Sequence, residues 1–162
     1  MYDFPLRTEG ALYEAPPRWG LDLLHEGISC VPQIPVISII DDDPSVRAAT
    51  HRLVRSLGFT ARTFESAADF LQSPHLNDTA CVIADVQMPG MSGVELQSVL
   101  IAQGSFVPMI FITAYPEDSI RSRAMKAGAI CFLSEPFDGL RMIECIRTAL
   151  KRHDDDDGNC RT

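Results

Sequence analysis

The 162-residue sequence lacks a long hydrophobic run, since none approaches the roughly 20 apolar residues that span a bilayer. Its first residues also lack the basic and apolar stretches of a secretory signal. Apolar residues make up 46% of the chain and charged residues 22%, close to the averages for globular proteins. These features exclude a membrane-spanning, collagenous or disordered chain, and they predict a cytoplasmic protein.

A basic stripe is also missing, so the sequence indicates no nucleic-acid partner. The net charge is −8, from 14 basic and 22 acidic residues. Seven of the acidic residues lie in two runs, Asp41–Asp43 and Asp154–Asp157, without which the net charge would be −1. The rest of the chain is nearly neutral, and the two acidic clusters need separate explanations.

The five cysteines form no C-x-x-C pair, and their number is odd. Cys81 and Cys131 fall within apolar, strand-like runs, where cysteine usually behaves as a small hydrophobic residue. We therefore expect reduced, structural thiols and no zinc site.

The two ends of the chain differ in composition from its centre. Residues 1–34 hold four prolines among scattered charges, which predicts an irregular N-terminal extension. Alternatively, translation starts at Val31 from a GTG codon, and the first thirty residues are not made. We expect one domain over residues 35–152, followed by an acidic tail over 153–162.

From residue 35 onward, apolar strand-like runs alternate with helical periodicities. The predicted strands are 35–40, 60–64, 80–84, 106–112 and 130–133, and the predicted helices are 45–57, one starting at Ser66, one from about 94, 117–127 and 140–150. Strands that are apolar throughout and alternate with helices form parallel sheets covered on both faces. The sequence therefore predicts a doubly wound α/β fold with a five-stranded parallel sheet.

Acidic and hydroxyl side chains follow several of these strands. Asp41–Asp43 follow the first strand, Asp85 the third and Thr113 the fourth, and in this fold class the site lies beyond the strands' carboxyl ends. Carboxylates 4 Å apart repel by about 4 kcal/mol in a partly screened site, so such a cluster favours a bound cation. Oxygen-only ligands suit Mg²⁺, beside which an aspartate can attack phosphorus to form an aspartyl phosphate.

This pattern resembles the receiver domain of two-component response regulators, most closely the FixJ-type branch. The specific motif is Asp-x-x-Met-Pro-x-Met-x-Gly, and the matching stretches are Ile39–Pro44, Ile83–Gly93, Phe111–Ala114 and Ala124–Ala129. The resemblance covers residues 35–152. It implies a flavodoxin-like sheet with strand order 2-1-3-4-5, and a phosphorelay signalling protein rather than a turnover enzyme.

The resemblance also implies a metal site and a phosphoacceptor. Asp85 matches the phosphoacceptor, and Asp41 and Asp42 match the acidic pair that holds Mg²⁺. Asp42 is expected to contact the ion directly and Asp41 through water. Gln87 is expected to supply a backbone carbonyl to the ion.

The remaining matched positions belong to the conformational switch of the family. Thr113 matches the hydroxyl that bonds a phosphoryl oxygen, with the small residue Ala114 beside it, and Phe132 matches the rotating aromatic. Asp43 precedes a proline at a predicted helix start, where aspartate is favoured, so we leave it out of the metal site.

One position departs from the family. The family carries a lysine before the proline that follows the fifth strand, and this chain has Glu135 there. That lysine pairs with the phosphoryl group, which itself adds roughly −1.5 to −2 charges. The exchange reverses the local charge, and the lost attraction has an upper limit of several kcal/mol. Glu135 either turns into water or shares the metal, and Lys126, in the middle of a predicted helix, is not expected to substitute.

The resemblance implies two kinds of protein partner. The first is a histidine kinase, and the second is a downstream protein that binds the face formed by residues 117–150. Many family members continue into a helix-turn-helix domain, whereas this sequence ends soon after its last predicted helix. We therefore expect a single-domain regulator that acts by protein contact, without nucleic acid or membrane, and that forms a homodimer or stays as single copies. The predicted contact residues on the fourth helix are Ile120, Arg121, Arg123, Met125 and Lys126.

Two other functions remain as alternatives. The first is a pseudo-receiver, a protein-binding module of the same fold that is not phosphorylated, and Glu135 is the feature that favours it. The second is a haloacid-dehalogenase-like phosphatase, which would use Asp41–Asp43 as its D-x-D motif. The sequence lacks the lysine and the later paired-acid metal motif that this phosphatase family requires. This alternative also leaves the Met-Pro-Gly-Met-Ser-Gly stretch unexplained.

Overall fold

The computed structural model describes residues 33–158 of the chain. The predicted irregular extension lies outside the described residues, apart from its last two positions. The elements are β1 (Val36–Ile40), α1 (Pro44–Ser56), β2 (Thr60–Phe64), α2 (Ala67–Leu71), a 3₁₀ helix (Leu76–Asp78), β3 (Thr79–Asp85), α3 (Gly93–Ala102), β4 (Met109–Thr113), α4 (Asp118–Lys126), β5 (Cys131–Ser134) and α5 (Gly139–Gly158).

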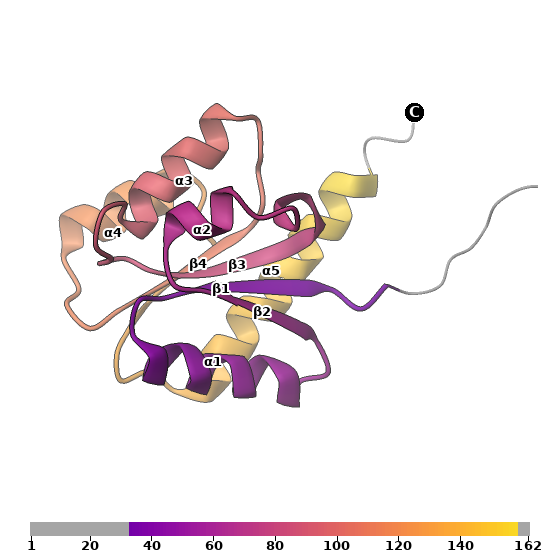
Figure 1. Ribbon diagram of the computed structural model, residues 1–162, viewed down its shortest axis with the longest axis horizontal. Coiled ribbons are helices and arrows are strands. Elements are labelled where there is room, and N and C mark those ends of the chain that lie inside the picture. Colours follow the sequence, from indigo (N-terminus) through magenta and orange to yellow (C-terminus); the bar gives the residue numbers. More distant parts are fainter. Residues whose placement is uncertain (1–32, 159–162) are drawn as a thin grey trace, which may run out of the picture. The chain divides into compact units, whose positions relative to one another are not determined.

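The five strands form one parallel sheet in the order β2-β1-β3-β4-β5, as predicted. Helices α1 and α5 cover one face, and α2, α3 and α4 cover the other (Figure 1). Successive residues of β3 show the arrangement, because Cys81 and Ile83 pack in the core under α1 and α5. Val82 and Ala84 pack in the core under α2, α3 and α4. Both faces of the sheet are thus buried, which explains why its strands read as continuous apolar runs.

The strand register aligns the residues that follow the strands. Ile40 pairs with Ala84, so Asp41 and Asp85 leave the sheet side by side. Thr113, at the end of β4, pairs with Ser134 at the end of β5. The backbone amide of Glu135 then donates to the Thr113 carbonyl at 2.8 Å. The ends of four strands therefore deliver their side chains to one edge of the sheet.

Short polar residues begin the helices near this edge. The Asp43 carboxylate accepts from the amides of Ser45 and Val46, with Pro44 in the first position of α1. Ser66 caps α2 by accepting from the Asp69 amide. Both caps were predicted, and each satisfies amides that an α-helix leaves without a partner.

Strand β4 is shorter than predicted. It starts at Met109 rather than at Phe106, whose side chain is 71% exposed. Pro108 has no amide hydrogen to donate to a neighbouring strand, so regular pairing begins only after it. The predicted strand therefore included three residues, 106–108, that lie outside the sheet.

Helix α5 is longer than predicted and continues to Gly158, through the four aspartates that we expected in a tail. The apolar periodicity ends at Leu150, but residues 151–157 contain neither glycine nor proline, so nothing in the backbone ends the helix there. Arg152 also holds this part of α5 to the domain, because its guanidinium donates to the Gly128 carbonyl at 3.2 Å.

The buried face of α5 also differs from the prediction. Leu140 was expected on the apolar side, but it is 67% exposed, whereas Met142 and Cys145 are buried with Ile146 and Ala149. At 3.6 residues per turn, Leu140 lies on the opposite side of the helix from Met142 and Ala149, so it faces away from the core.

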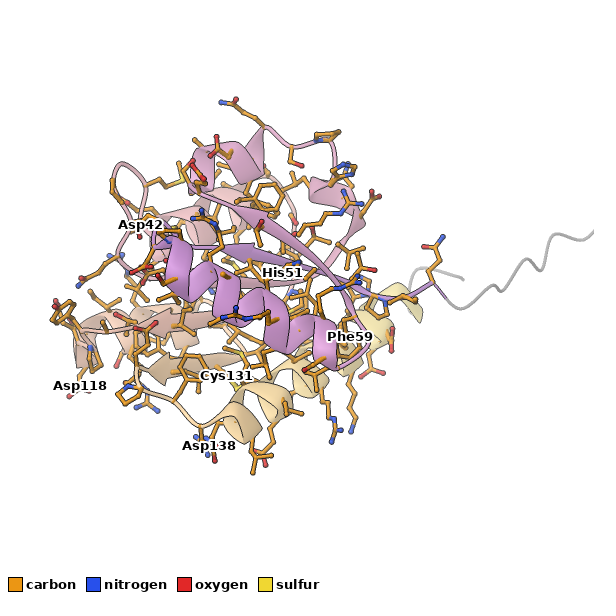
Figure 2. All side chains as sticks on the ribbon, turned by 60° about the horizontal axis from the view of Figure 1, so that its bottom comes forward. Asp42, His51, Phe59, Asp118, Cys131 and Asp138 are labelled. Carbon is orange, nitrogen blue, oxygen red and sulfur yellow. A yellow bond between two sulfur atoms is a disulfide. The ribbon has the colours of Figure 1, made fainter. Side chains whose placement is uncertain are left out.

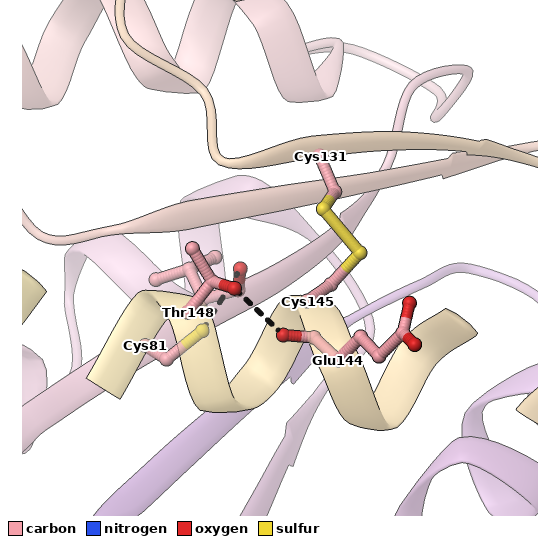
Figure 3. Close-up of a disulfide and its surroundings, with 6 residues drawn as sticks. Cys81, Cys131, Glu144, Cys145 and Thr148 are labelled. Carbon is pink, nitrogen blue, oxygen red and sulfur yellow. Dashed lines mark hydrogen bonds between the residues drawn. A yellow bond between two sulfur atoms is a disulfide. The ribbon is translucent and has the colours of Figure 1, made fainter. Parts of the chain in front are cut away.

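Cys131 and Cys145 form a disulfide, which contradicts the prediction of reduced thiols. Figure 3 shows the bond joining β5 to α5. The Cα atoms of the two cysteines are 6.0 Å apart, although 14 residues separate them in the sequence. The prediction was wrong because the return of α5 onto the sheet brings the pair together, and no local spacing reveals that contact.

Cys81 is the free cysteine among the described residues. Burial raises the pKa of its thiol to about 12, which makes it an unreactive core residue, as expected. None of the helices within residues 33–158 combines the length and the apolar character that a membrane crossing requires.

Replacing Cys131 by serine should lower the free energy of unfolding by about 3 kcal/mol under oxidising conditions, because the bridge closes a loop of moderate length in the unfolded chain. Urea unfolding with and without a reducing agent measures the difference. The reductant should destabilise the parent and leave Cys131→Ser unchanged; an equal effect on both proteins would rule out a stabilising disulfide.

Candidate functional site

Three carboxylates converge at the carboxyl edge of the sheet. One oxygen each from Asp41, Asp42 and Asp85 lies within 4.8 Å of the other two. Figure 2 shows Asp42 beside the first turn of α1. The three residues line a pocket of about 230 Å³, whose other walls are Asp43, Val46, Gln87, Thr113, Ala114, Tyr115 and Glu135. No lysine or arginine is among these residues.

Asp41 is held by the loop between β1 and α1. Its side chain is buried, and one of its oxygens accepts from the Asp43 amide at 2.8 Å. Arg47 donates to the Asp41 carbonyl at 2.7 Å and also pairs with Glu65 at 3.1 Å. Sequence reasoning missed Arg47, because its contact with the Asp41 carbonyl depends on how the loop folds and leaves no signal in the sequence.

Asp85 ends β3, and its surroundings restrain both its backbone and its side chain. The Gln87 amide donates to one carboxylate oxygen at 3.1 Å. Gly93, the first residue of α3, lies against the Asp85 carbonyl so closely that a Cβ on Gly93 would collide with that oxygen. Gly93 was noted only as part of the motif, and it acts here as a positioning residue that lets α3 start against the Asp85 carbonyl.

Burial weakens the acidity of two of the carboxyl groups. The pKa of Asp41 is raised to about 6, mainly by desolvation and further by the charges of Asp85, Asp42 and Glu135. The pKa of Asp85 is also raised to about 6, again mainly by desolvation and with contributions from Asp42 and Glu135. Hydrogen bonds from the Asp43 and Gln87 amides oppose these shifts. The free pocket therefore disfavours the charges that its residue types supply.

Thr113 lies on the wall of this pocket and is almost fully buried. Its hydroxyl accepts from the Tyr115 amide at 3.2 Å and donates to the Tyr115 carbonyl at 3.3 Å. Tyr115, which is 72% exposed, was not singled out from the sequence. In this conformation the hydroxyl is engaged by its own loop.

Phe132 is not among the residues that line the acidic pocket. It is half-buried on β5 and packs against Phe111, with ring centroids 6.3 Å apart. Its predicted role as a switch aromatic stays a prediction.

Glu135 takes part in the acidic pocket. Its amide is anchored to Thr113, the following peptide bond to Pro136 is cis, and its side chain is partly buried among the pocket walls. Lys126 is exposed on α4 and is not among the lining residues. The pocket thus holds a carboxylate, and no cationic side chain of a described residue, where the sequence resemblance led us to look for a lysine.

The donor set fits a hard divalent cation. Asp41, Asp42 and Asp85 provide carboxylate oxygens, Gln87 lines the same pocket, and the described residues there provide no thiolate or imidazole. Such oxygen-only sites suit Mg²⁺. A bound Mg²⁺ would supply the positive charge that the side chains of this pocket lack.

Comparison with known proteins agrees with the fold. Residues 37–147 match the family model of the response regulator receiver domain. The chain is 42% identical over 116 residues to the response regulator protein TmoT of Ectopseudomonas mendocina, covering 72% of this chain and 53% of TmoT. It is 37% identical over 122 residues to the transcriptional regulatory protein FixJ of Azorhizobium caulinodans, covering 75% of this chain and 58% of FixJ.

A crystal structure of a response regulator receiver protein from Burkholderia phymatum has a TM-score of 0.62 and 40% identity, with 72% of this chain and 95% of that chain covered. The fold and the acidic edge define a signalling domain of two-component systems. The chain belongs to the response regulator receiver domain family. It spans about half the length of the curated relatives that it matches first.

Replacing Gly93 by alanine should destabilise the domain by about 1–3 kcal/mol, because the new methyl group meets the Asp85 carbonyl and also approaches Phe111. Gly139→Ala is the matched control, since Gly139 also begins a helix and a Cβ there meets nothing within 4 Å. Thermal unfolding compares the two. Equal stability of both variants would contradict the proposed close contact.

Without divalent cations, Asp85→Asn should be more stable than the parent near pH 7.5 and similar to it near pH 4. The raised pKa of Asp85 means that its favourable contribution is complete below about pH 3.8 and is lost as the pH rises through about 6. Thermal unfolding across this range tests the difference, with Glu144→Gln on the exposed side of α5 as a control. A stability difference that does not change with pH would refute the assignment.

Proposed function

We propose that this chain is a phosphorelay receiver in which Asp85 accepts a phosphoryl group from a histidine kinase. The convergence of Asp41, Asp42 and Asp85 in one pocket with Thr113 is the observation that supports it. Receiver domains bind Mg²⁺ at such an acidic pocket and belong to signalling proteins rather than to a catalytic enzyme family. We infer the same for this pocket, with Asp85 modified and regenerated rather than turning over a substrate.

In the proposed transfer, a carboxylate oxygen of Asp85 attacks the phosphorus of a phosphohistidine. The new O–P bond forms as the P–N bond breaks, and the imidazole nitrogen leaves with the electron pair and takes up a proton. Gln87 supports the geometry through its amide, which already contacts the Asp85 carboxylate. Thr113 would turn from Tyr115 toward the new phosphoryl oxygens, which would couple the modification to the β4–α4 loop.

The proposed cation site uses Asp42 as a direct ligand, Asp41 through water, Asp85 itself and the Gln87 carbonyl. When bound, Mg²⁺ would neutralise charge on the transferring oxygens. Phe132 would complete the switch, because its packing against Phe111 links β5 to the strand that carries Thr113.

We propose that the output is protein contact through the face formed by residues 117–150. Arg121, Arg123 and Lys126 are exposed on α4, and Met125 is 40% exposed. Ile120 was predicted to share this face, but it is only partly exposed and packs against the core, so it would contribute less. A homodimer through this face is an alternative to a different downstream protein.

Other sequence predictions belong to the same proposal. They are a cytoplasmic location, no nucleic-acid or membrane partner, a domain over residues 35–152 and an extension over 1–34. The predicted single-domain architecture stays a prediction, because the relatives matched first are about twice as long as the matched region.

The alternative function is a pseudo-receiver that binds partners without phosphorylation. Glu135 favours it, because a carboxylate in the acidic pocket opposes the arrival of a phosphoryl group. The three clustered aspartates and Thr113 favour phosphorylation instead.

Intact mass after incubation with Mg²⁺ and acetyl phosphate distinguishes the two functions. We expect the parent to gain one phosphoryl group and Asp85→Asn to gain none. Glu135→Lys should react at least about tenfold faster than the parent, because it restores part of the several kcal/mol of attraction that the glutamate removes. Glu144→Gln is the control for removing a carboxylate elsewhere. No gain by the parent, with gain by Glu135→Lys, would establish the pseudo-receiver instead.

A further inference from the structure

Glu135 shares a pocket with three carboxylates, and that proximity has a cost unless something balances the charge. Glu135, Asp41, Asp42 and Asp85 all line the acidic pocket. The Glu135 charge acts on both Asp41 and Asp85. Its backbone is held to the end of β4 by the bond to Thr113, so the side chain starts from the rim of the site.

Two arginines, Arg47 and Arg123, lie near this edge. Arg47 donates to the Asp41 carbonyl and pairs with Glu65. Arg123 lies in the groove next to the acidic pocket, where Asp42 and Gln87 form the shared wall, and its charge acts on Glu95. Neither arginine lines the acidic pocket itself. The described residues that line the pocket therefore include no side-chain cation to balance its carboxylates.

We propose that Glu135 is a fourth acidic group of the divalent-cation site and strengthens cation binding. The inference rests on the proposed function, since it concerns the same pocket. A lysine at this position would be attracted to Asp85 and would compete with the cation for that carboxylate. A glutamate removes the competitor and adds attraction, so the cation takes over the charge balance that the lysine provides in the family.

This role has a consequence for phosphorylation. Tighter cation binding lowers the charge of the pocket before the phosphodonor arrives, and it offsets part of the repulsion that Glu135 adds. The parent should therefore need a bound cation more strictly than Glu135→Lys does. Glu135 would act as a specificity residue for the cation, while Asp85 remains the group that reacts.

Calorimetric titration of the full chain with Mg²⁺ at pH 7.5, without a phosphodonor, tests the inference. Glu135→Gln should weaken binding about tenfold and Glu135→Lys about 100-fold, the range for residues that support metal ligands. Glu144→Gln, which removes an exposed carboxylate from α5, should bind as the parent does. Asp42→Asn is the reference for loss of a direct ligand.

A second probe guards against a variant that folds poorly. Mn²⁺ binding, followed by the loss of its free-ion electron paramagnetic resonance signal, should give the same order of affinities. Circular dichroism without metal must show the same helix content in all variants, and Glu135→Gln preserves the side-chain shape. Equal affinities for the parent and Glu135→Gln, with weak binding by Asp42→Asn, would overturn the role of Glu135 and leave the metal site intact.

The other outcomes separate this inference from the proposed function. No binding of either ion by the parent would overturn both the role of Glu135 and the metal site. The predicted order of affinities, together with no phosphorylation of the parent, would support the role of Glu135 and reject phosphotransfer.

Discussion

The repulsion among carboxylates at one edge of a parallel sheet is the constraint on which this structure depends. The register of β1, β3 and β4 brings Asp41, Asp85 and Thr113 to the same edge, and the loop after β1 adds Asp42. Desolvation makes these charges more costly, as the raised pKa values of Asp41 and Asp85 show. A pocket of this kind is unfavourable without positive charge, so its residues favour a bound cation.

The rest of the fold serves to hold this edge in place. Asp43 caps α1 beside the site, so the helix begins where the acidic loop ends. Gly93 allows α3 to start against the Asp85 carbonyl, and the sheet, covered on both faces, fixes the strand ends. Cys131 is the first residue of β5, the strand that directly precedes Glu135. Its bond to Cys145 ties β5 to α5.

Sequence reasoning reached the two-sided covering of the sheet and the residues of the acidic edge, because buried parallel strands and their carboxyl ends leave strong local patterns. The strand order came from the family resemblance, not from those patterns. Sequence reasoning failed where a feature depends on contacts between distant segments. The disulfide needs the packing of α5 on β5, which no local spacing reveals. The contact of Arg47 with the Asp41 carbonyl and the Thr113–Tyr115 pair are also products of loop conformation that no spacing encodes.

A crystal structure of the full chain with Mg²⁺ and beryllofluoride, which mimics a phosphoryl group on a carboxylate, tests the account most directly. We expect beryllofluoride on Asp85, the cation in contact with Asp42, Asp85 and the Gln87 carbonyl, the Glu135 carboxylate turned toward the cation, and the Thr113 hydroxyl turned from Tyr115 to a fluorine. An unmodified Asp85 in a pocket without a cation would contradict the central claim.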